Sequence, residues 1–307
     1  MKSGLTLLLL ASYVAGWWGA PLDQSVELLF VGDIMLSRGV GRIMAEKGDW
    51  EYPFAEIKST LAEADLLIGN LEGPIGDSGV KVGSIYSFRA DPRAVAGLTS
   101  TGFDVLSLAN NHIWDYGREA LADTFLLLDQ AGVGYIGAGV DYEQAHRAVV
   151  EEVKGTKIAF LSYTDLIPAS VTQVISKPAV AYLDLKQVVP DIVKAEELAD
   201  LTVVLLHWGE EYKTKHNEKQ EAIAHALIDA GADLVVGHHP HVAQEIEQYK
   251  DGYIAYSLGN FVFDQNFSTD TRSGLILKVA VKNKKIETVE SQKIKFTQTY
   301  QPTLVYE

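Results

Sequence analysis

The chain has 307 residues, 47% of them hydrophobic, so it can bury a large core and is neither a disulfide miniprotein nor a disordered chain. Its formal net charge of −15, from 41 acidic and 26 basic residues, argues against a nucleic-acid partner, because neutralising phosphates requires a basic surface. It contains no cysteine, so any metal ion must bind to His, Asp, Glu or Asn side chains.

The first 20 residues have the layout of a secretory signal peptide. The apolar run Leu5–Ala11 follows a lysine and leads to small residues up to Ala20. Two tryptophans crowd the expected cleavage site, so an uncleaved membrane anchor and a buried first helix remain alternatives. No later stretch of the sequence is apolar over a length that spans a bilayer. We therefore expect residues 26–307 to form one extracytoplasmic domain, secreted or tethered to the membrane at the cell surface.

Strand-like and helix-like segments alternate along the rest of the chain. Short runs rich in Val, Ile and Leu predict strands at Val26–Val31, Asp65–Gly69, Asp104–Leu108, Lys157–Tyr163, Leu201–His207, Leu234–Gly237 and Tyr253–Leu258. Helical periodicity lies between them at Ser37–Ala45, Ala94–Ser100, Arg118–Gln130, Val188–Glu197 and Lys219–Ala230, with Gly132 and Gly231 as stop signals. Because most of the strands are apolar on both faces, this order predicts an α/β fold whose sheet is covered on both sides.

The C-terminal part has a different pattern. Leu275–Lys282 and Lys285–Phe296, separated by an Asn-Lys turn, predict a β-hairpin, and Arg147–Val153 predicts a further single strand. We expect these antiparallel strands to close one edge of the sheet.

Polar residues gather directly after the predicted strands. In open α/β sheets the ligand site lies at the carboxyl ends of the strands. Five of the eight histidines fall there, together with an aspartate, a glutamate and two asparagines: His112, His207, His238, His239, His241, Asp33, Glu72, Asn70 and Asn111. Nitrogen and oxygen donors without sulfur suit Zn²⁺, Mn²⁺ or Fe²⁺, so the sequence predicts a site for one or two divalent ions.

Such a site is suited to hydrolysis. A divalent ion lowers the pKa of a bound water molecule and polarises the oxygen of the bond to be cleaved. An additional histidine such as His112 can protonate the leaving group. Asp115 either orients the His112 imidazole or caps the helix that begins near Gly117, and the sequence leaves both roles open.

Taken one at a time, these residues also have ordinary interpretations. The Gly-Asp pair at Asp33 can be a turn with a helix cap, the Gly-Asn pair at Asn260 can be a simple turn, and a single buried histidine such as His207 is often part of a core. Three histidines within residues 238–241 are harder to explain by packing. Independent turns have no reason to share one edge of a sheet, so the set as a whole favours a functional site.

The ordered motifs resemble those of the CapA family, the poly-γ-glutamate capsule synthesis proteins of the calcineurin-like metallophosphoesterase superfamily. The motifs are Gly32-Asp33-Ile34-Met35, Gly69-Asn70-Leu71-Glu72, Ala109-Asn110-Asn111-His112, His207-Trp208-Gly209, Gly237-His238-His239-Pro240-His241 and Ser257-Leu258-Gly259-Asn260-Phe261. The similarity runs from about Val26 to Gln265. It implies a four-layer αββα sandwich, a bacterial cell-surface location and a role in making or exporting poly-γ-glutamate, without establishing the reaction.

The resemblance also implies roles for individual residues. Asp33 matches the first metal-binding aspartate, Asn111 and His112 match the metal-binding asparagine and its neighbouring acid, and His207 matches the next ligand. The final His-x-His pair falls on His239 and His241, with His238 as the alternative to His239. Two positions depart from the superfamily pattern. Met35 stands where a histidine ligand is expected, and the bridging aspartate falls on Asn70, for which Glu72 is the candidate substitute.

The expected substrate is an anionic polymer such as poly-γ-glutamate, which an acidic protein can attract only through a local positive site. Arg38, Arg89 and Asn260 are the candidate substrate contacts, although Arg38 can equally be a solvated surface residue and Arg89 fits that interpretation better. The leading hypothesis is a CapA-like protein with a divalent-metal hydrolase site, acting in capsule polymer synthesis or processing, with membrane synthase subunits as partners. The alternatives are a phosphoesterase with an unrelated substrate and a non-enzymatic protein that holds the polymer or serves as a synthase scaffold.

Overall fold

The computed structural model describes residues 25–83, 85–167 and 177–306. The segment predicted to be a signal peptide or membrane anchor, residues 1–20, lies outside these ranges. Across the described ranges, none of the helices combines the length and apolar character needed to cross a membrane.

Two β-sheets form the centre of the molecule. The first has eight strands in the order β16-β15-β14-β1-β2-β3-β4, with β13 also paired to β1. They are β1 (Val26–Ile34), β2 (Leu66–Leu71), β3 (Val105–Ser107), β4 (Gly134–Ile136), β13 (Asn260–Val262), β14 (Ser273–Lys282), β15 (Lys285–Phe296) and β16 (Pro302–Leu304).

The second sheet has six strands in the order β11-β12-β10-β9-β7-β6. They are β6 (Val149–Val153), β7 (Thr156–Thr164), β9 (Leu201–His207), β10 (Leu234–His238), β11 (Ile246–Tyr249) and β12 (Gly252–Ala255). A separate antiparallel pair joins β5 (Ala138–Gly139) and β8 (Ala179–Val180).

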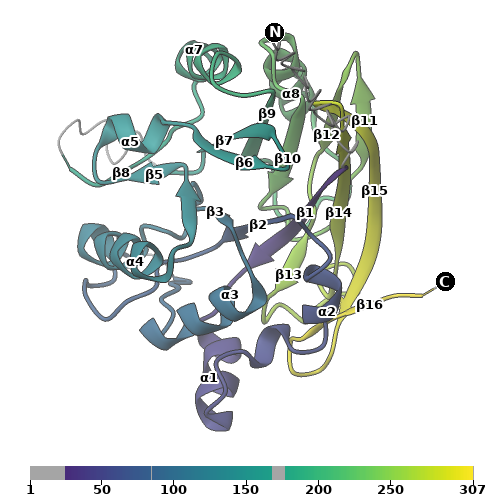
Figure 1. The fold of residues 1–307 in the computed structure, drawn as a ribbon. Helices are drawn as coiled ribbons and strands as arrows, with labels where there is room; N and C mark the ends of the chain where they lie inside the picture. The colour runs from purple at the N-terminus through teal and green to yellow at the C-terminus, as the bar shows by residue number, and fades with distance from the viewer. Residues whose placement is uncertain (1–24, 84, 168–176, 307) are drawn as a thin grey trace, which may run out of the picture.

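Helices cover the outer face of each sheet (Figure 1). The first sheet is covered by α1 (Arg38–Lys47), α2 (Lys58–Leu61), α3 (Val95–Thr101) and α4 (Gly117–Ala131), with the short 3₁₀ helices η1 (Tyr52–Phe54) and η2 (Pro92–Ala94). The second is covered by α5 (Tyr142–His146), α7 (Leu185–Glu196) and α8 (Glu218–Asp229).

Alternation along the strands creates three apolar layers. On β1, Leu28 and Phe30 lie in the layer between the sheets, whereas Leu29 and Val31 lie in the layer beneath the helices. The strands of the second sheet divide their side chains in the same way between the central layer and the layer under α7 and α8. Successive side chains of a strand point to opposite faces, so strands buried on both faces must be apolar throughout. The expected four-layer αββα sandwich is confirmed.

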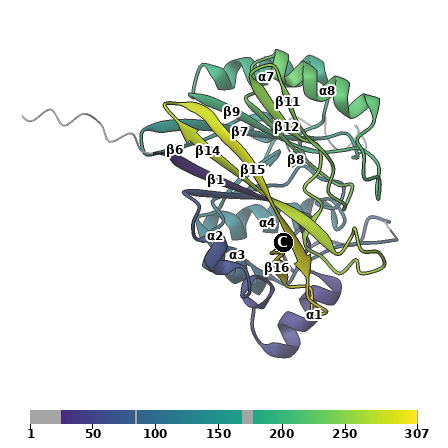
Figure 2. The ribbon, with the colours of Figure 1, turned by 90° about the vertical axis from the view of Figure 1, so that its right-hand side faces the viewer.

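The antiparallel segments differ from the expectation in one respect. The predicted hairpin is present as β14 and β15, turning at Asn283 and Lys284, both with positive φ, and Figure 2 shows it running along one side of the molecule. It pairs with β1 through β14 and extends the first sheet. However, β6 pairs antiparallel with β7 at an edge of the second sheet, and β11 pairs antiparallel with β12 at its other edge. Antiparallel strands therefore lie at edges of both sheets. The expectation of one closed edge assumed a single sheet, whereas the structure has two large sheets.

Candidate metal centre

The parallel strands of both sheets bring the predicted residues to one end of the sandwich. Asp33 pairs in register with Asn70 on β2 and with Asn260 on β13, all at strand ends of the first sheet. In the second sheet, His207 at the end of β9 pairs with His238 at the end of β10. All five side chains are buried.

Six side chains form two groups with the spacing of metal ligands. Within each group, one nitrogen or oxygen from each residue lies within 4.8 Å of the others, and the groups are Asp33, Glu72 and His207, and Glu211, His239 and His241. His241 joins them, because its Nδ1 lies 3.2 Å from Asp33 Oδ2 and its Nε2 lies 3.7 Å from Glu72 Oε1. The arrangement is one continuous cluster of three histidines and three carboxylates.

Unsatisfied polar atoms in this cluster test whether it suits a metal ion. Both carboxylate oxygens of Glu72 and the Nδ1 atom of His239 are buried and have no hydrogen-bond partner among the described residues. A buried carboxylate without donors is costly, so such groups are normally paired or coordinate a metal. Carboxylate oxygen and imidazole nitrogen bind Zn²⁺ at about 2.0–2.2 Å, and the close spacing of these atoms matches that demand. The residues present therefore fit a divalent cation.

Burial and neighbouring charges shift the pKa values of the cluster in different directions. Burial, followed by the neighbouring histidines, holds the pKa of His207 well below its usual value, so the imidazole is in the neutral form that binds metals. Burial raises the pKa of Glu72 well above its usual value. Burial opposes the charge on His241 as well, but Glu72 and Asp33 outweigh it and raise the pKa of His241 to about 9. Without a metal ion, the His241 imidazolium is the counter-charge for the carboxylates.

Asn70 holds the ligands in place through its side-chain amide. Its Nδ2 donates to Asp33 Oδ1 at 2.8 Å and lies 3.3 Å from His207 Nδ1. Its Oδ1 accepts a hydrogen bond from Asn110 Nδ2 at 3.1 Å. Glu72, two residues later, contributes the carboxylate to the cluster. The amide of Asn70 thus contacts residues around the metal position, and its own role as a ligand stays a prediction.

The two histidines that compete for one ligand position have different surroundings. His238 ends β10, and its Nε2 lies 3.2 Å from the carbonyl oxygen of Val31 on β1. His239 follows it with a φ of 96° and lies in the group with Glu211 and His241. A non-glycine residue with positive φ is uncommon and such strain concentrates at functional sites. The structure brings His239 to the cluster, whereas the contact of His238 joins the two sheets.

Glu211 is a candidate ligand that the sequence analysis did not select. It lies on the loop after β9, four residues beyond His207, and the backbone N–H of Tyr212 donates to the carbonyl oxygen of Pro240 at 2.8 Å. This bond ties the loop to the turn that carries His239. The sequence does show two glutamates, Glu210 and Glu211, shortly after the strand-end histidine His207. Which of the two reaches the cluster depends on how the loop folds.

His112 and Asp115 form a pair beside the cluster. His112 Nδ1 lies 2.7 Å from Asp115 Oδ2, which also accepts a hydrogen bond from the backbone N–H of Phe88 at 2.7 Å. The Phe88 ring stacks on the imidazole with 3.8 Å between centroids, and His112 Nε2 lies 3.9 Å from Glu72 Oε1. The N-cap of α4 is Tyr116, without a side-chain cap. Of the two interpretations of Asp115, the structure therefore favours orientation of the imidazole.

Asn111 and Asn260 each contact one histidine of the cluster. Asn111 Oδ1 lies 2.8 Å from His207 Nε2, and Asn260 Oδ1 lies 2.9 Å from His241 Nδ1. The Asn260 amide nitrogen donates to Gln265 and to the carbonyl oxygen of Thr271. A carbonyl oxygen that holds one ring nitrogen of a histidine fixes the orientation of the other nitrogen towards a metal. These contacts make Asn260 a positioning residue for His241.

The two predicted arginine contacts are placed differently. The Arg38 Nε lies 3.3 Å from Asp264 Oδ2, and its guanidinium lies over the rings of Tyr86 and Phe88, the ring that stacks on His112. Arg38 therefore lies next to the His112 pair. Arg89 donates to three loop carbonyl oxygens, of residues 77–79, and stacks over Tyr116. These contacts brace the loop, and a substrate contact by Arg89 stays a prediction.

The fold is a four-layer αββα sandwich of the calcineurin-like metallophosphoesterase type. The NAD nucleotidase NadN of Haemophilus influenzae superposes with a TM-score of 0.52 at 11% identity, over 92% of this chain and 60% of that chain, which supports the fold alone.

The chain belongs to the family of the bacterial capsule synthesis protein PGA_cap, whose family model matches residues 27–265. It is 37% identical over 262 residues to the capsule biosynthesis protein CapA of Bacillus anthracis, covering 83% of this chain. It is 35% identical over 257 residues to the PGA biosynthesis protein CapA of Bacillus subtilis strain 168, covering 83% of this chain and 67% of that protein. The chain spans only 64% of the length of the Bacillus anthracis protein.

Proposed function

We propose that the chain is a divalent-metal hydrolase that acts on an anionic glutamate polymer during capsule synthesis or processing. The observation that carries this proposal is the Glu72 carboxylate, which is buried without a hydrogen-bond donor among ligand-type side chains. The names of the relatives support the polymer, since they describe capsule and PGA biosynthesis.

We assign the ligand residues of the cluster to two ions. Asp33, Glu72 and His207 hold one ion, and Glu211, His239 and His241 hold a second. A bound divalent ion supplies a water molecule of lowered pKa and polarises the bond to be cleaved. Within the set, only nitrogen and oxygen donors occur, which favours Mn²⁺, Zn²⁺ or Fe²⁺.

His112 is the proposed proton donor to the leaving group. Asp115 holds Nδ1 of the imidazole, which leaves Nε2 facing the cluster, 3.9 Å from Glu72. A carboxylate in this position fixes the tautomer and stabilises the imidazolium before proton transfer. Phe88 packs on the ring and excludes water from one face.

Arg38 is the proposed contact for a substrate carboxylate. The protein carries a net charge of −15, so a polyanion needs a local cation near the reacting bond. Arg38 lies over Phe88 and is anchored by Asp264, while its side chain is 38% exposed and can still reach solvent and substrate. We also propose secretion or membrane tethering and a membrane synthase as a partner, in line with a role at the cell surface.

The test is metal content and turnover measured on the same preparations. The protein, purified without chelator, is analysed for transition metal per chain and assayed on poly-γ-glutamate and on a simple phosphodiester. His207→Ala should lose both metal and turnover, while His225→Ala, a matched histidine paired with Glu247 outside the cluster, should keep both. If the protein cleaves only the phosphodiester, its substrate is a phosphoester and not the proposed glutamate polymer. Wild-type protein without metal after soaking in Mn²⁺ or Zn²⁺ would contradict the proposal and favour a polymer-holding role.

A further inference from the structure

A polar cavity borders Gln265, which is hydrogen-bonded to Asn260 beside the candidate metal centre. It is a cavity of about 370 Å³ between the segment after β13 and the end of β15, lined by Gln265, Asn266, Arg272, Phe296, Thr297, Gln298 and Tyr300. None of these seven residues is acidic, although the protein as a whole has 41 acidic residues. The cavity therefore departs from the charge of the rest of the molecule.

Gln265 connects this cavity to the ligands of the cluster. Its Oε1 accepts a hydrogen bond from Asn260 Nδ2 at 3.2 Å, and Asn260 in turn holds His241. Its Nε2 donates to the hydroxyl of Tyr212 at 3.4 Å, the residue that follows Glu211. One side chain thus forms part of the cavity wall and contacts the supports of two candidate metal ligands.

Arg38 borders the same segment from the other direction. Asp264, adjacent to Gln265, accepts a hydrogen bond from the backbone N–H of Gly39 at 2.9 Å and pairs with Arg38. A Cβ atom at Gly39 would lie 3.2 Å from the ring of Tyr300, so the start of α1 packs against the cavity wall. Two arginines, Arg38 and Arg272, consequently flank the segment after β13.

The groups that line the cavity are those that recognise an amide-linked chain of carboxylates. Within the described part of the protein, Arg272 has no ion-pair partner for its guanidinium, and the side chains of Asn266 and Gln298 have no hydrogen-bond partner. A guanidinium binds a carboxylate in a bidentate manner, and side-chain amides can both donate to and accept from peptide-type groups. Phe296 and Tyr300 offer apolar surface for methylene groups. A phosphate ester would use the arginine but not the array of amides.

We infer that this cavity is a subsite for the continuing chain of a polyglutamate substrate, next to the bond that is cleaved at the metal centre. The inference rests on the proposed function and adds where the polymer beyond the reacting unit is held. Arg272 takes a side carboxylate, and Gln298 and Asn266 pair with amide groups of the chain.

The experiment measures binding and turnover for glutamate oligomers of increasing length. Arg272→Ala and Gln298→Ala alter exposed side chains, so both variants should fold and keep the metal content of the wild type. For Arg272→Ala the KM for long oligomers should rise by about tenfold, as for the loss of one charged hydrogen bond, with a smaller rise for the shortest oligomer. Arg147→Ala, a matched exposed arginine outside the cavity, should leave KM unchanged at every length. Equal KM values for wild type and Arg272→Ala at all lengths would overturn the inference.

Equilibrium binding of a labelled oligomer separates this inference from the proposed hydrolysis. If the wild type binds the oligomer but does not cleave it, and Arg272→Ala binds about tenfold more weakly, the subsite stands while the hydrolase proposal fails. Inorganic polyphosphate is the comparison ligand. If Gln298→Ala weakens polyphosphate and glutamate oligomer equally, recognition of an amide-linked chain is wrong.

Discussion

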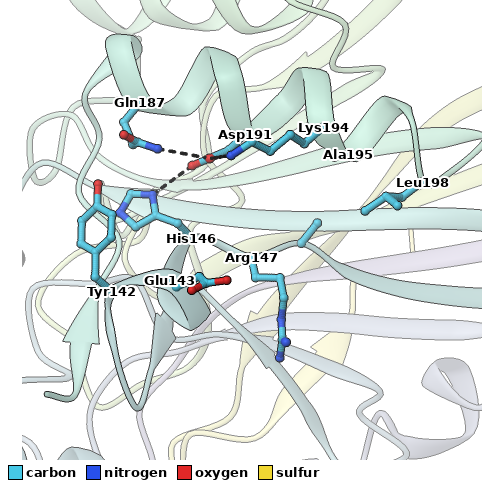
Figure 3. A pocket seen from close by; sticks show the side chains of 10 residues that line it. Tyr142, Glu143, His146, Arg147, Gln187, Asp191, Lys194, Ala195 and Leu198 are labelled. Carbon is cyan, nitrogen blue, oxygen red and sulfur yellow. Dashed lines mark hydrogen bonds and ion pairs between the residues drawn. The ribbon is translucent and has the colours of Figure 1, made fainter. Parts of the chain in front are cut away.

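Two buried clusters in this protein join histidine to carboxylate, and they differ in how the carboxylate oxygens are satisfied. The first is the candidate metal centre around Glu72. The second lies in a cavity of about 290 Å³ between α5 and α7, where His146 Nδ1 lies 3.0 Å from Asp191 Oδ2 (Figure 3). Tyr163 donates to the same oxygen at 3.1 Å, and Gln187 donates to the other at 3.3 Å. Every oxygen of Asp191 has a donor, whereas neither oxygen of Glu72 has one.

We interpret this difference as the contrast between a structural cluster and a candidate functional one. Both oxygens of Asp191 are satisfied, which is the usual state of a buried carboxylate, and His146 Nε2 is the one atom of this pair that is buried without a hydrogen-bond partner among the described residues. A carboxylate left without donors among histidines needs a cation. The other two histidines outside the centre, His216 and His225, also pair with glutamates and stack on tyrosines, as expected for histidines without a role in metal binding.

The largest predicted contrast is between the two His–Asp pairs. His112→Ala should lower turnover by about 10²–10⁴-fold, because it removes the proposed proton donor. His146→Ala should leave turnover of the remaining folded protein unchanged, because His146 lies in the α5–α7 cavity and not at the metal centre. Steady-state kinetics corrected for the folded fraction measures both. Equal losses in the two variants would remove the distinction between the clusters.

The second contrast concerns stability. Asp191→Ala should lower the free energy of unfolding by about 1–3 kcal/mol, because it leaves the buried His146 and Tyr163 side chains without their hydrogen-bond acceptor. Metal content per chain should stay at the wild-type value. Denaturant unfolding followed by circular dichroism gives the first quantity and elemental analysis the second. Glu245→Ala, at the more exposed His216 pair, is the control and should cost about 0–1 kcal/mol. Loss of metal in Asp191→Ala would show that the two clusters depend on each other.

Metal removal tests the candidate metal centre directly, without a change at the His146 cluster. At a free metal concentration of 100 times the dissociation constant, chelation should lower the free energy of unfolding by about 2.7 kcal/mol. The same treatment should have a smaller effect on Asp33→Ala, which lacks a ligand of one of the two proposed ions. Thermal unfolding with and without chelator measures the shift. A chelator effect in Asp33→Ala as large as in the wild type would show that Asp33 is not a ligand of the bound metal.

The smallest predicted effect concerns the support of a ligand. Asn260→Ala frees the imidazole of His241 and should weaken metal binding by about 10–100-fold while leaving the ligand set intact. Metal titration of the apoprotein measures the affinity. His225→Ala serves again as the control with unchanged affinity. An unaltered affinity in Asn260→Ala would assign Asn260 to substrate contact, as the sequence alone suggested.

The local sequence pattern was sufficient to predict most of the secondary structure. The strand predicted at Leu201–His207 is β9 residue for residue, and Gly132 ends α4 in the left-handed conformation expected for a helix stop. Both depend on short-range properties, namely apolar side chains on two faces and the conformational freedom of glycine. The residues that follow the strands were predictable for the same reason, since parallel strands place their ends at a common edge.

The sequence by itself determined the class of fold, the donor chemistry of the site and the family, because these follow from residue type, order and spacing. Only the tertiary structure decided which side chains meet. It brought Glu211 into the cluster through the bond between Tyr212 and Pro240, set His238 against the backbone of β1, and turned Asp115 towards His112. The first two outcomes depend on contacts between segments far apart in the chain, and the third on a local turn whose aspartate is also held by the backbone of Phe88. A linear sequence pattern contains neither kind of information.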